Sequence, residues 1–325
     1  MRSASLAAAG FCFVCRNRSA TCGIGGHHRR NNRDVSAKHL NDTPNHPDDG
    51  ISHGEIPIIY EDDRIMAVNK PPHLSHHDGD QSGSGIISLL REQRPDGRLY
   101  GVHRLDRVTS GVLLLAKDSF TASALMTKFA KREVVKYYVA ISHRKAKKKQ
   151  GWVRGEMAKS RRGSYKLIPE KQSSSDSKEY AVSRYFTAGL GNLDLSSSLA
   201  RDESSGAATP RTLVLFQPKT GRTHQLRVAA KSIGLPILGD SRYGGGRVVM
   251  TPGDDSHVRT YLHACAISFT LDGNNEPTTI WSPPSFQHLF ADNEFNTVLE
   301  NAFIKHCDCQ HIVDALLNES KVTNQ

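Results

Sequence analysis

Residues 99–117 read LYGVHRLDRVTSGVLLLAK. The polar part of this segment ends where the apolar run Val112–Ala116 begins, and that run has the length of a buried strand rather than of a helix. Asp106 lies between Arg104 and Arg107, with no other carboxylate within nine residues along the chain. We therefore expect Asp106 to stay ionised near neutral pH, beside surplus positive charge that suits a polyanion.

An ordinary surface turn is the alternative interpretation of the same residues. Thr109 and Ser110 can hydrogen-bond to the backbone, and Gly111 can adopt a positive φ. Composition alone does not separate a solvated turn from an active-site segment. The order of the residues is what favours a catalytic function.

The order His-Arg-Leu-Asp-Arg-x-Thr-Ser-Gly, over residues 103–111, resembles the active-site signature of the RluA-type pseudouridine synthases, enzymes that isomerise uridine in RNA. The resemblance implies that Asp106 is the catalytic aspartate. It also implies RNA or base contacts for four neighbours of Asp106, namely His103, Arg104, Arg107 and Thr109.

Two apolar runs precede this segment, at residues 56–60 and 65–68, and a charged turn separates them. They predict a β-hairpin that ends at two prolines, because proline cannot donate to a strand ladder. The end of the hairpin resembles the first motif of the family, which implies an RNA or base contact for Lys70. His73 stands where the family usually has glycine.

A helix and a strand are expected directly after the catalytic segment. Residues 121–133 predict an amphipathic helix whose apolar stripe, expected in the core, consists of Ala122, Leu125, Met126 and Phe129. Residues 134–142 predict a strand, and its KYYVA segment resembles the next landmark of the family. The resemblance places Tyr138 against the target base, whereas an ordinary core tyrosine is the alternative.

A further strand over residues 212–216 leads into TGRTHQLR at 220–227, which resembles another family motif. The resemblance makes Arg227 the arginine that pairs with the catalytic aspartate. Without the resemblance, Arg227 would be interpreted as an exposed arginine on a helix. The same motif implies that three further residues bind RNA or the base: Arg222, His224 and Leu226.

The resemblance covers about residues 56–284 and implies an α+β pseudouridine synthase domain with a mixed, mostly antiparallel sheet, flanking helices and a central cleft. The implied reaction breaks the C1′–N1 bond of a uridine, turns the base and rejoins it through C5, after the nucleotide is flipped out of its helix. It requires no cofactor. A carboxylate can act in it as nucleophile or by electrostatic stabilisation, and the sequence leaves both open.

The two ends of the chain differ in composition from its middle. Residues 1–33 contain six arginines and no acidic residue, which predicts a transit peptide for a mitochondrion or plastid. A disordered basic tail on a cytoplasmic protein is the alternative. Residues 34–55 predict a disordered linker, 189–210 a flexible insertion, and 285–325 a helical C-terminal extension.

The net charge of +10 falls to +4 when the six arginines of residues 1–33 are left out. RNA, either tRNA or rRNA, must then be bound by local basic patches, of which residues 144–149 are the densest. We expect no membrane partner, because no apolar run approaches the roughly 20 residues that span a bilayer. We also expect the chain to act as a monomer. The segment HCDCQH at 306–311 lacks the second ligand pair of a structural zinc site, so no metal site is predicted.

Two other classes of function remain as alternatives. A non-catalytic RNA-binding or assembly factor on the same fold would be favoured if Asp106, Tyr138 or Arg227 were missing, and all three are present. A hydrolase built on Ser110, His103 and Asp106 would have to form its triad within eight positions of the chain, which is rare.

Overall fold

The computed structural model describes residues 55–78, 85–95, 97–193, 209–244, 259–273, 276–284, 288–290 and 292–322. All of them belong to one unit, which spans residues 52–325. The expected transit peptide, and all of the expected linker except Glu55, lie outside the described residues.

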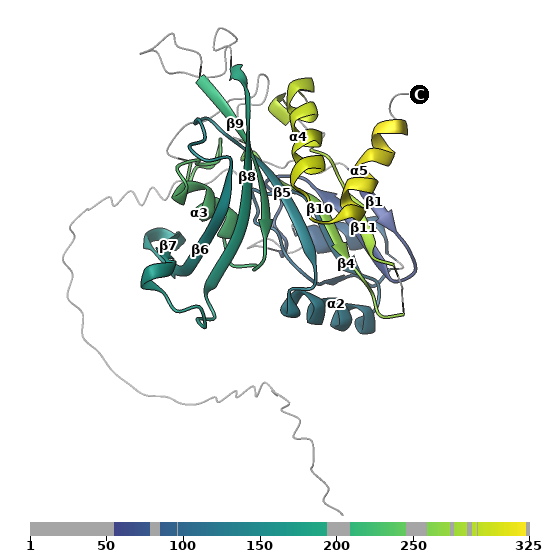
Figure 1. The fold of residues 1–325 in the computed structure, drawn as a ribbon. Helices are drawn as coiled ribbons and strands as arrows, with labels where there is room; N and C mark the ends of the chain where they lie inside the picture. Colours follow the sequence, from purple (N-terminus) through teal and green to yellow (C-terminus); the bar gives the residue numbers. More distant parts are fainter. Residues whose placement is uncertain are drawn as a thin grey trace, which may run out of the picture. The chain divides into compact units, whose positions relative to one another are not determined.

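The described residues build one mixed sheet (Figure 1) with the strand order β1-β2-β4-β10-β5-β9-β8-β6-β7, while β3 pairs with β4 and β11 with β10. Its neighbours run antiparallel except for the parallel pair β4 and β10. The strands are β1 Ile58–Glu61, β2 Ile65–Lys70, β3 Tyr100–Gly101, β4 Ser110–Ala116, β5 Val135–Ser142, β6 Gln150–Lys159, β7 Tyr165–Pro169, β8 Tyr180–Leu193, β9 Thr209–Pro218, β10 Leu262–Phe269 and β11 Thr278–Trp281.

Helices cover both faces of this sheet. They are α1 Ile86–Gln93, α2 Ser119–Lys131, α3 Gln225–Ser232, α4 Asn293–His306 and α5 Gln310–Val322, with short 3₁₀ turns at Arg161–Gly163, Glu170–Gln172 and His288–Phe290. The expected α+β class with a mixed, mostly antiparallel sheet is confirmed. None of the helices in the described part of the chain is long and apolar enough to cross a bilayer.

Side chains of the central strands alternate between two cores. Leu215 of β9 packs in the cluster that includes α4, whereas the next residue, Phe216, packs in the cluster that includes α3. In β5, Tyr137 belongs to the α4 cluster, while the adjacent Tyr138 packs against clusters on the other side. Because successive side chains of a strand point to opposite faces, this separates Tyr138 from the C-terminal helices.

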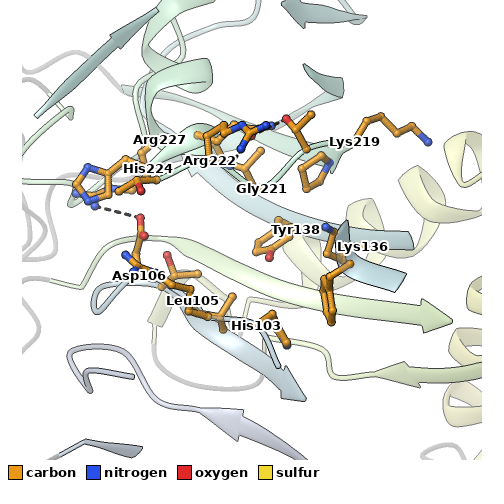
Figure 2. Close-up of a pocket in the computed structure, with 18 of the residues that line it drawn as sticks. His103, Leu105, Asp106, Lys136, Tyr138, Lys219, Gly221, Arg222, His224 and Arg227 are labelled. Atoms are coloured by element: carbon orange, nitrogen blue, oxygen red, sulfur yellow. Dashed lines mark hydrogen bonds and ion pairs between the residues drawn. The ribbon is translucent and has the colours of Figure 1, made fainter. Parts of the chain in front are cut away.

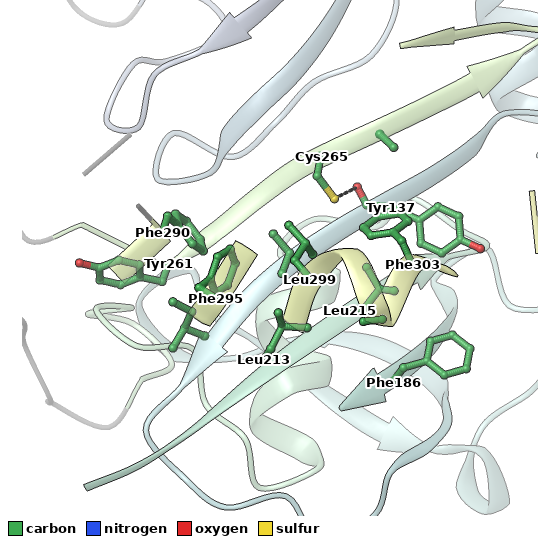
Figure 3. Packing of buried hydrophobic residues seen from close by; sticks show 14 of the residues in the cluster. Tyr137, Phe186, Leu213, Leu215, Tyr261, Cys265, Phe290, Phe295, Leu299 and Phe303 are labelled. Atoms are coloured by element: carbon green, nitrogen blue, oxygen red, sulfur yellow. Dashed lines mark hydrogen bonds between the residues drawn. The ribbon is translucent and has the colours of Figure 1, made fainter. Parts of the chain in front are cut away.

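The C-terminal extension is part of the main core. Figure 3 shows Phe295, Leu299 and Phe303 of α4 lying against the sheet, where they pack in one cluster with Tyr137 and Leu213. Helix α4 contacts β8 and β9, and α5 contacts β10 and β11. The expected helices are therefore present, but residue 284 is not a boundary in the packing.

Two further expectations need correction. The insertion expected at 189–210 is shorter at both ends, because β8 continues through Leu193 and β9 begins at Thr209; residues 194–208 lie outside the described part. Met126, expected in the core, is 55% exposed, because the inner side of α2 is formed by residues such as Ala122 and Leu125.

Gly111 and His73, on either side of the catalytic turn, both have a positive φ. Gly111 has a φ of 110°, and a Cβ there would lie 2.2 Å from the Ala264 carbonyl oxygen, so glycine lets β10 pair closely with β4. His73 has a φ of 67°, a conformation that glycine adopts without strain. The left-handed backbone therefore explains the usual glycine at this family position.

We expect Gly111→Ala to lower the free energy of unfolding by about 2–4 kcal/mol, because the new methyl group meets backbone rather than a movable side chain. Denaturant unfolding would measure this loss. Gly189→Ala is the matched control, since a Cβ at that position meets nothing within 4 Å. Equal stability of the two variants would contradict the close approach of β10 to β4.

Candidate active site

Asp106 is presented by a tight turn at the start of β4. The Thr109 amide donates to the Asp106 carbonyl oxygen at 3.0 Å, which closes the turn. Leu105 and Thr109 on either side of the turn are buried, whereas the Asp106 side chain keeps 19% of its surface exposed. The carboxylate is thus held by buried neighbours and remains accessible.

Arg227 on α3 lies between two carboxylates. Its Nη1 is 3.3 Å from Asp106 Oδ2, as the dashed line in Figure 2 marks. Its Nε and Nη2 donate to the two oxygens of Asp240 at 2.7 and 2.9 Å. This two-pronged pair uses the planar shape of the guanidinium and aims the third nitrogen at Asp106.

Asp240 is fully buried, with 0% of its side chain exposed. Its Oδ1 also accepts hydrogen bonds from the Arg242 and Tyr243 amides at 3.0 Å each, so the carboxylate is fixed by its own turn. Burial by itself would lower the pKa of Arg227, but the hydrogen bonds and charge of Asp240, together with Asp106, outweigh it and raise that pKa. Arg227 therefore stays charged while buried.

Tyr138 and Lys136 project from β5 into a cavity of about 470 Å³. Figure 2 shows these two side chains between the Asp106 turn and the segment 219–227. Burial and the negative charge of Asp106 raise the pKa of Tyr138, so its hydroxyl stays protonated at neutral pH. Burial lowers the pKa of Lys136 to about 8.

The opposite wall of the cavity is held in place by Gln225. Its Oε1 accepts from the Arg222 amide and the Thr220 hydroxyl, at 2.9 and 2.8 Å, and its amide group donates to the Val182 carbonyl. His224, which precedes α3, has a φ of 55° and shares a 2.8 Å hydrogen bond with the Tyr243 hydroxyl. The non-glycine residue in this conformation is fixed by its tertiary contacts.

All but two of the site residues expected from sequence line this cavity. They are His103, Arg104, Asp106, Thr109, Tyr138, Arg222, His224, Leu226 and Arg227. Arg104 and Arg107, which flank Asp106 in the sequence, are both exposed, and Arg107 Nε donates to the His73 carbonyl at 2.8 Å. The cation that pairs with Asp106 is Arg227, as the resemblance implies, because the fold brings α3 to the catalytic turn.

Lys70 lies beneath the site rather than in it. Its side chain is completely buried, and Nζ donates to the carbonyls of Pro71, Leu74 and Arg107 at 2.8, 2.9 and 3.2 Å. Burial lowers the pKa of Lys70 to about 7. Its ammonium group joins the end of the first hairpin to the catalytic turn, so the expected direct contact with RNA does not fit this position.

The alternative triad of Ser110, His103 and Asp106 does not form. His103 Nε2 accepts from the Leu114 amide at 2.9 Å, which holds the ring against β4. Ser110 Oγ instead lies 2.9 Å from His263 Nδ1, and His263 Nε2 donates to the Ser282 carbonyl. His263 is completely buried, so this Ser–His pair belongs to the support of the sheet.

Sequence reasoning did not assign a role to three residues of the site. Asp240 lies in a segment that resembles the family, but nothing local marks it as the partner of Arg227. Lys136 and Lys219 line the cavity as well. The position of Lys136 two residues before Tyr138 on one strand was a usable signal, because such residues share a face.

The comparison with known families agrees with this geometry. Residues 64–232 match the family model for RNA pseudouridylate synthase. A protein of Haemophilus influenzae described as an uncharacterized RNA pseudouridine synthase is 35% identical over 220 residues, which are 68% of this chain and 84% of that protein. Ribosomal large subunit pseudouridine synthase C of Vibrio vulnificus is 33% identical over 70% of this chain and 65% of its own length.

A solved structure has the same fold. Human RNA pseudouridylate synthase domain containing 1 superposes with a TM-score of 0.54 at 22% identity, covering 72% of this chain and 85% of that chain. The site and the family match together define an enzyme of the isomerase class. The chain belongs to the RNA pseudouridylate synthase family.

The segment 306–311 contains two histidines, two cysteines and Asp308. Among the described residues, no group of three or more His, Cys, Asp or Glu side chains is placed to hold a metal ion. Asp308 instead accepts a hydrogen bond from the Tyr137 hydroxyl at 2.6 Å, which ties the C-terminal extension to β5.

We expect Arg227→Ala to destabilise the protein by about 3–5 kcal/mol, because Asp240 would remain as a buried charge without its partner. The double variant Arg227→Ala with Asp240→Asn should regain part of this stability, since the uncompensated charge is gone. Thermal and denaturant unfolding of the single and double variants measure this coupling.

Arg211→Ala is the control for that cycle. Arg211 is as buried as Arg227, but its carboxylate partners Asp292 and Glu294 are 35% and 45% exposed and can be hydrated. Its loss should cost less stability than the loss of Arg227. A double variant no more stable than Arg227→Ala alone would mean that Asp240 does not depend on Arg227.

Proposed function

We propose that this chain converts specific uridines in RNA to pseudouridine, with Asp106 as the catalytic carboxylate. The observation that carries the proposal is the arrangement around Arg227. The fully buried Asp240 holds this arginine, and the arginine in turn contacts the accessible Asp106. A carboxylate held in this way at a cavity that also contains Tyr138 can serve a reaction at a sugar or a base.

The reaction requires that the C1′–N1 bond break, that the uracil turn, that a C5–C1′ bond form, that the proton on C5 leave and that N1 take up a proton, so that substrate and product are isomers. Asp106 would act on the flipped-out nucleotide, either as nucleophile or by stabilising developing positive charge. Tyr138 would lie against the base. Its raised pKa keeps a neutral hydroxyl there, which can take part in the proton transfer from C5 as a hydrogen-bonding group.

RNA is the substrate class that the family supports, and we propose rRNA or tRNA as the particular substrate. The Vibrio relative is named for the large ribosomal subunit, which supports rRNA. A uridine within a stem cannot reach Asp106 at the cavity, so the target nucleotide has to leave its stack at a cost of a few kcal/mol. Arg104, exposed at the mouth of the cavity, would fill the vacated place.

We further propose that the enzyme acts as a monomer in a mitochondrion or plastid. The arrangement of Asp106, Arg227 and Asp240 is complete within one chain, which supports a monomer. The arginine-rich, acid-free composition of residues 1–33 supports import into an organelle. Fractionation of cells that express the full chain tests this location, and enzyme confined to the cytoplasm would contradict it.

Asp106→Asn should reduce pseudouridine formation at least about 100-fold while leaving RNA affinity nearly unchanged, because it removes the charge but keeps the shape. The substrate is RNA from cells that lack the gene, and the sites are mapped before and after treatment with the enzyme. The assay contains a chelator and no added nucleotide. Full activity of the Asn variant, or activity that returns only with added metal, would overturn the proposal.

Replacing Lys147 and Lys148 by Ala should weaken RNA binding. The plot of log affinity against log salt concentration should also become less steep, by about 0.7–0.9 in slope for each phosphate that is no longer neutralised. Both lysines are exposed in the loop between β5 and β6. The single-turnover rate on saturated enzyme should not change. Arg94→Ala is the control, because it removes an exposed cation that pairs with Glu61 on β1. If Arg94→Ala weakened binding as much as the lysine variant does, a local role of the two lysines would be contradicted.

A further inference from the structure

A large aromatic side chain is exposed on β6, outside the cavity. Trp152 has 45% of its surface exposed, and two guanidinium groups lie over its ring, those of Arg154 at 4.9 Å and Arg184 at 5.8 Å. Among the described residues, no carboxylate pairs with Arg154. Because Trp152 stays 45% exposed beside these two arginines, it offers aromatic surface for stacking together with positive charge.

Trp152 lies on the α4 face of the sheet. Its neighbour Val153 packs in the α3 cluster, so Trp152 points to the other side. Trp152 pairs across the strands with Arg184, and Arg184 pairs with Gln217. These three side chains therefore form a row across β6, β8 and β9.

The C-terminal extension ends this row at Asp308. The Gln217 amide group donates to Asp308 Oδ1, and Arg184 lies 3.8 Å from Oδ2. Lys219 lies 3.7 Å from the same Oδ2. One carboxylate thus positions two cations, Arg184 and Lys219. Arg154 adds a third positive charge beside Trp152, and Glu156 on the same face of β6 adds a second negative charge, so the row keeps an excess of positive charge.

Lys219 connects this surface to the cavity. It lines the cavity that holds Asp106, while its ammonium group faces Asp308 on the α4 side. Strands are spaced about 4.8 Å apart, so Trp152 on β6 lies roughly 10 Å from β9, a span of about three stacked nucleotides. The cavity opens on the other face of the sheet, so the RNA has to pass Lys219 at the end of β9 to reach the α4 face, and Trp152 then lies within reach of the nucleotides beside the target.

We propose that Trp152, with Arg154 and Arg184, is a stacking site for an unpaired nucleotide that flanks the target uridine. This inference rests on the proposed function, because it assigns a second binding point to the same RNA. Single-stranded RNA matches both properties of the surface, since its bases stack on aromatic rings and its phosphates take up the positive charge. An acidic peptide would use the charge but leave the indole face without a partner.

Tryptophan fluorescence tests the stacking directly. The chain has two tryptophans, and the other one, Trp281, is only 9% exposed. An oligouridylate of about ten nucleotides should quench the fluorescence of the wild type in a saturable manner, and Trp152→Phe should lose that quenching. If a short RNA duplex or oligoglutamate quenched the fluorescence and the oligouridylate did not, the proposal would be wrong.

Binding and turnover complete the test. Trp152→Ala should bind the oligouridylate about 5- to 100-fold more weakly, and Trp152→Phe should keep most of the affinity because it retains an aromatic face. Phe120→Ala removes another exposed aromatic side chain, 74% exposed on α2, and should bind like the wild type. Because Trp152 is on the surface, all three variants should unfold like the wild type.

The outcomes separate this inference from the proposed function. If the wild type forms pseudouridine and Trp152→Ala binds and modifies RNA equally well, the stacking site is wrong and the function stands. If the wild type forms no pseudouridine but Trp152 is quenched and its loss weakens binding, the stacking site stands and the function is wrong. Weaker RNA binding by Trp152→Ala in an active enzyme supports both.

Discussion

The site depends on the pairing of Arg227 with the buried Asp240. A guanidinium with 6% of its side chain exposed is costly to bury alone, and the two-pronged pair with Asp240 compensates that cost. Once two of its nitrogens are committed, the third is directed at Asp106. The buried Arg227–Asp240 pair therefore orients the accessible carboxylate of Asp106.

Several polar residues in or near the active-site motif support the catalytic turn. Lys70 reaches the Arg107 carbonyl, His103 accepts from the Leu114 amide, and Ser110 bonds to His263. Each satisfies a buried polar group that would otherwise be costly. The active-site motif thus combines residues that face the cavity with residues that hold the loop at the sheet.

The C-terminal extension contributes to the catalytic domain in two ways. Phe295 and Phe303 complete the core on the face of β5 opposite to Tyr138. Asp308 bonds to Tyr137, the neighbour of Tyr138, and to Gln217 on β9. A segment beyond the part of the chain that matches the family model therefore braces the strand that carries a cavity residue.

The sequence by itself determined the hairpin before the catalytic segment, strands β4, β5 and β9, helix α2, and the cluster of residues around Asp106. These follow from apolar periodicity and from motifs that are contiguous in the chain. Only the tertiary structure decided that Asp240 holds Arg227, 13 residues away, and that Ser110 bonds to His263, 153 residues away. It also decided that Arg104 and Arg107 do not pair with Asp106. Such pairings depend on which strands become neighbours in the sheet, and local patterns do not encode that order.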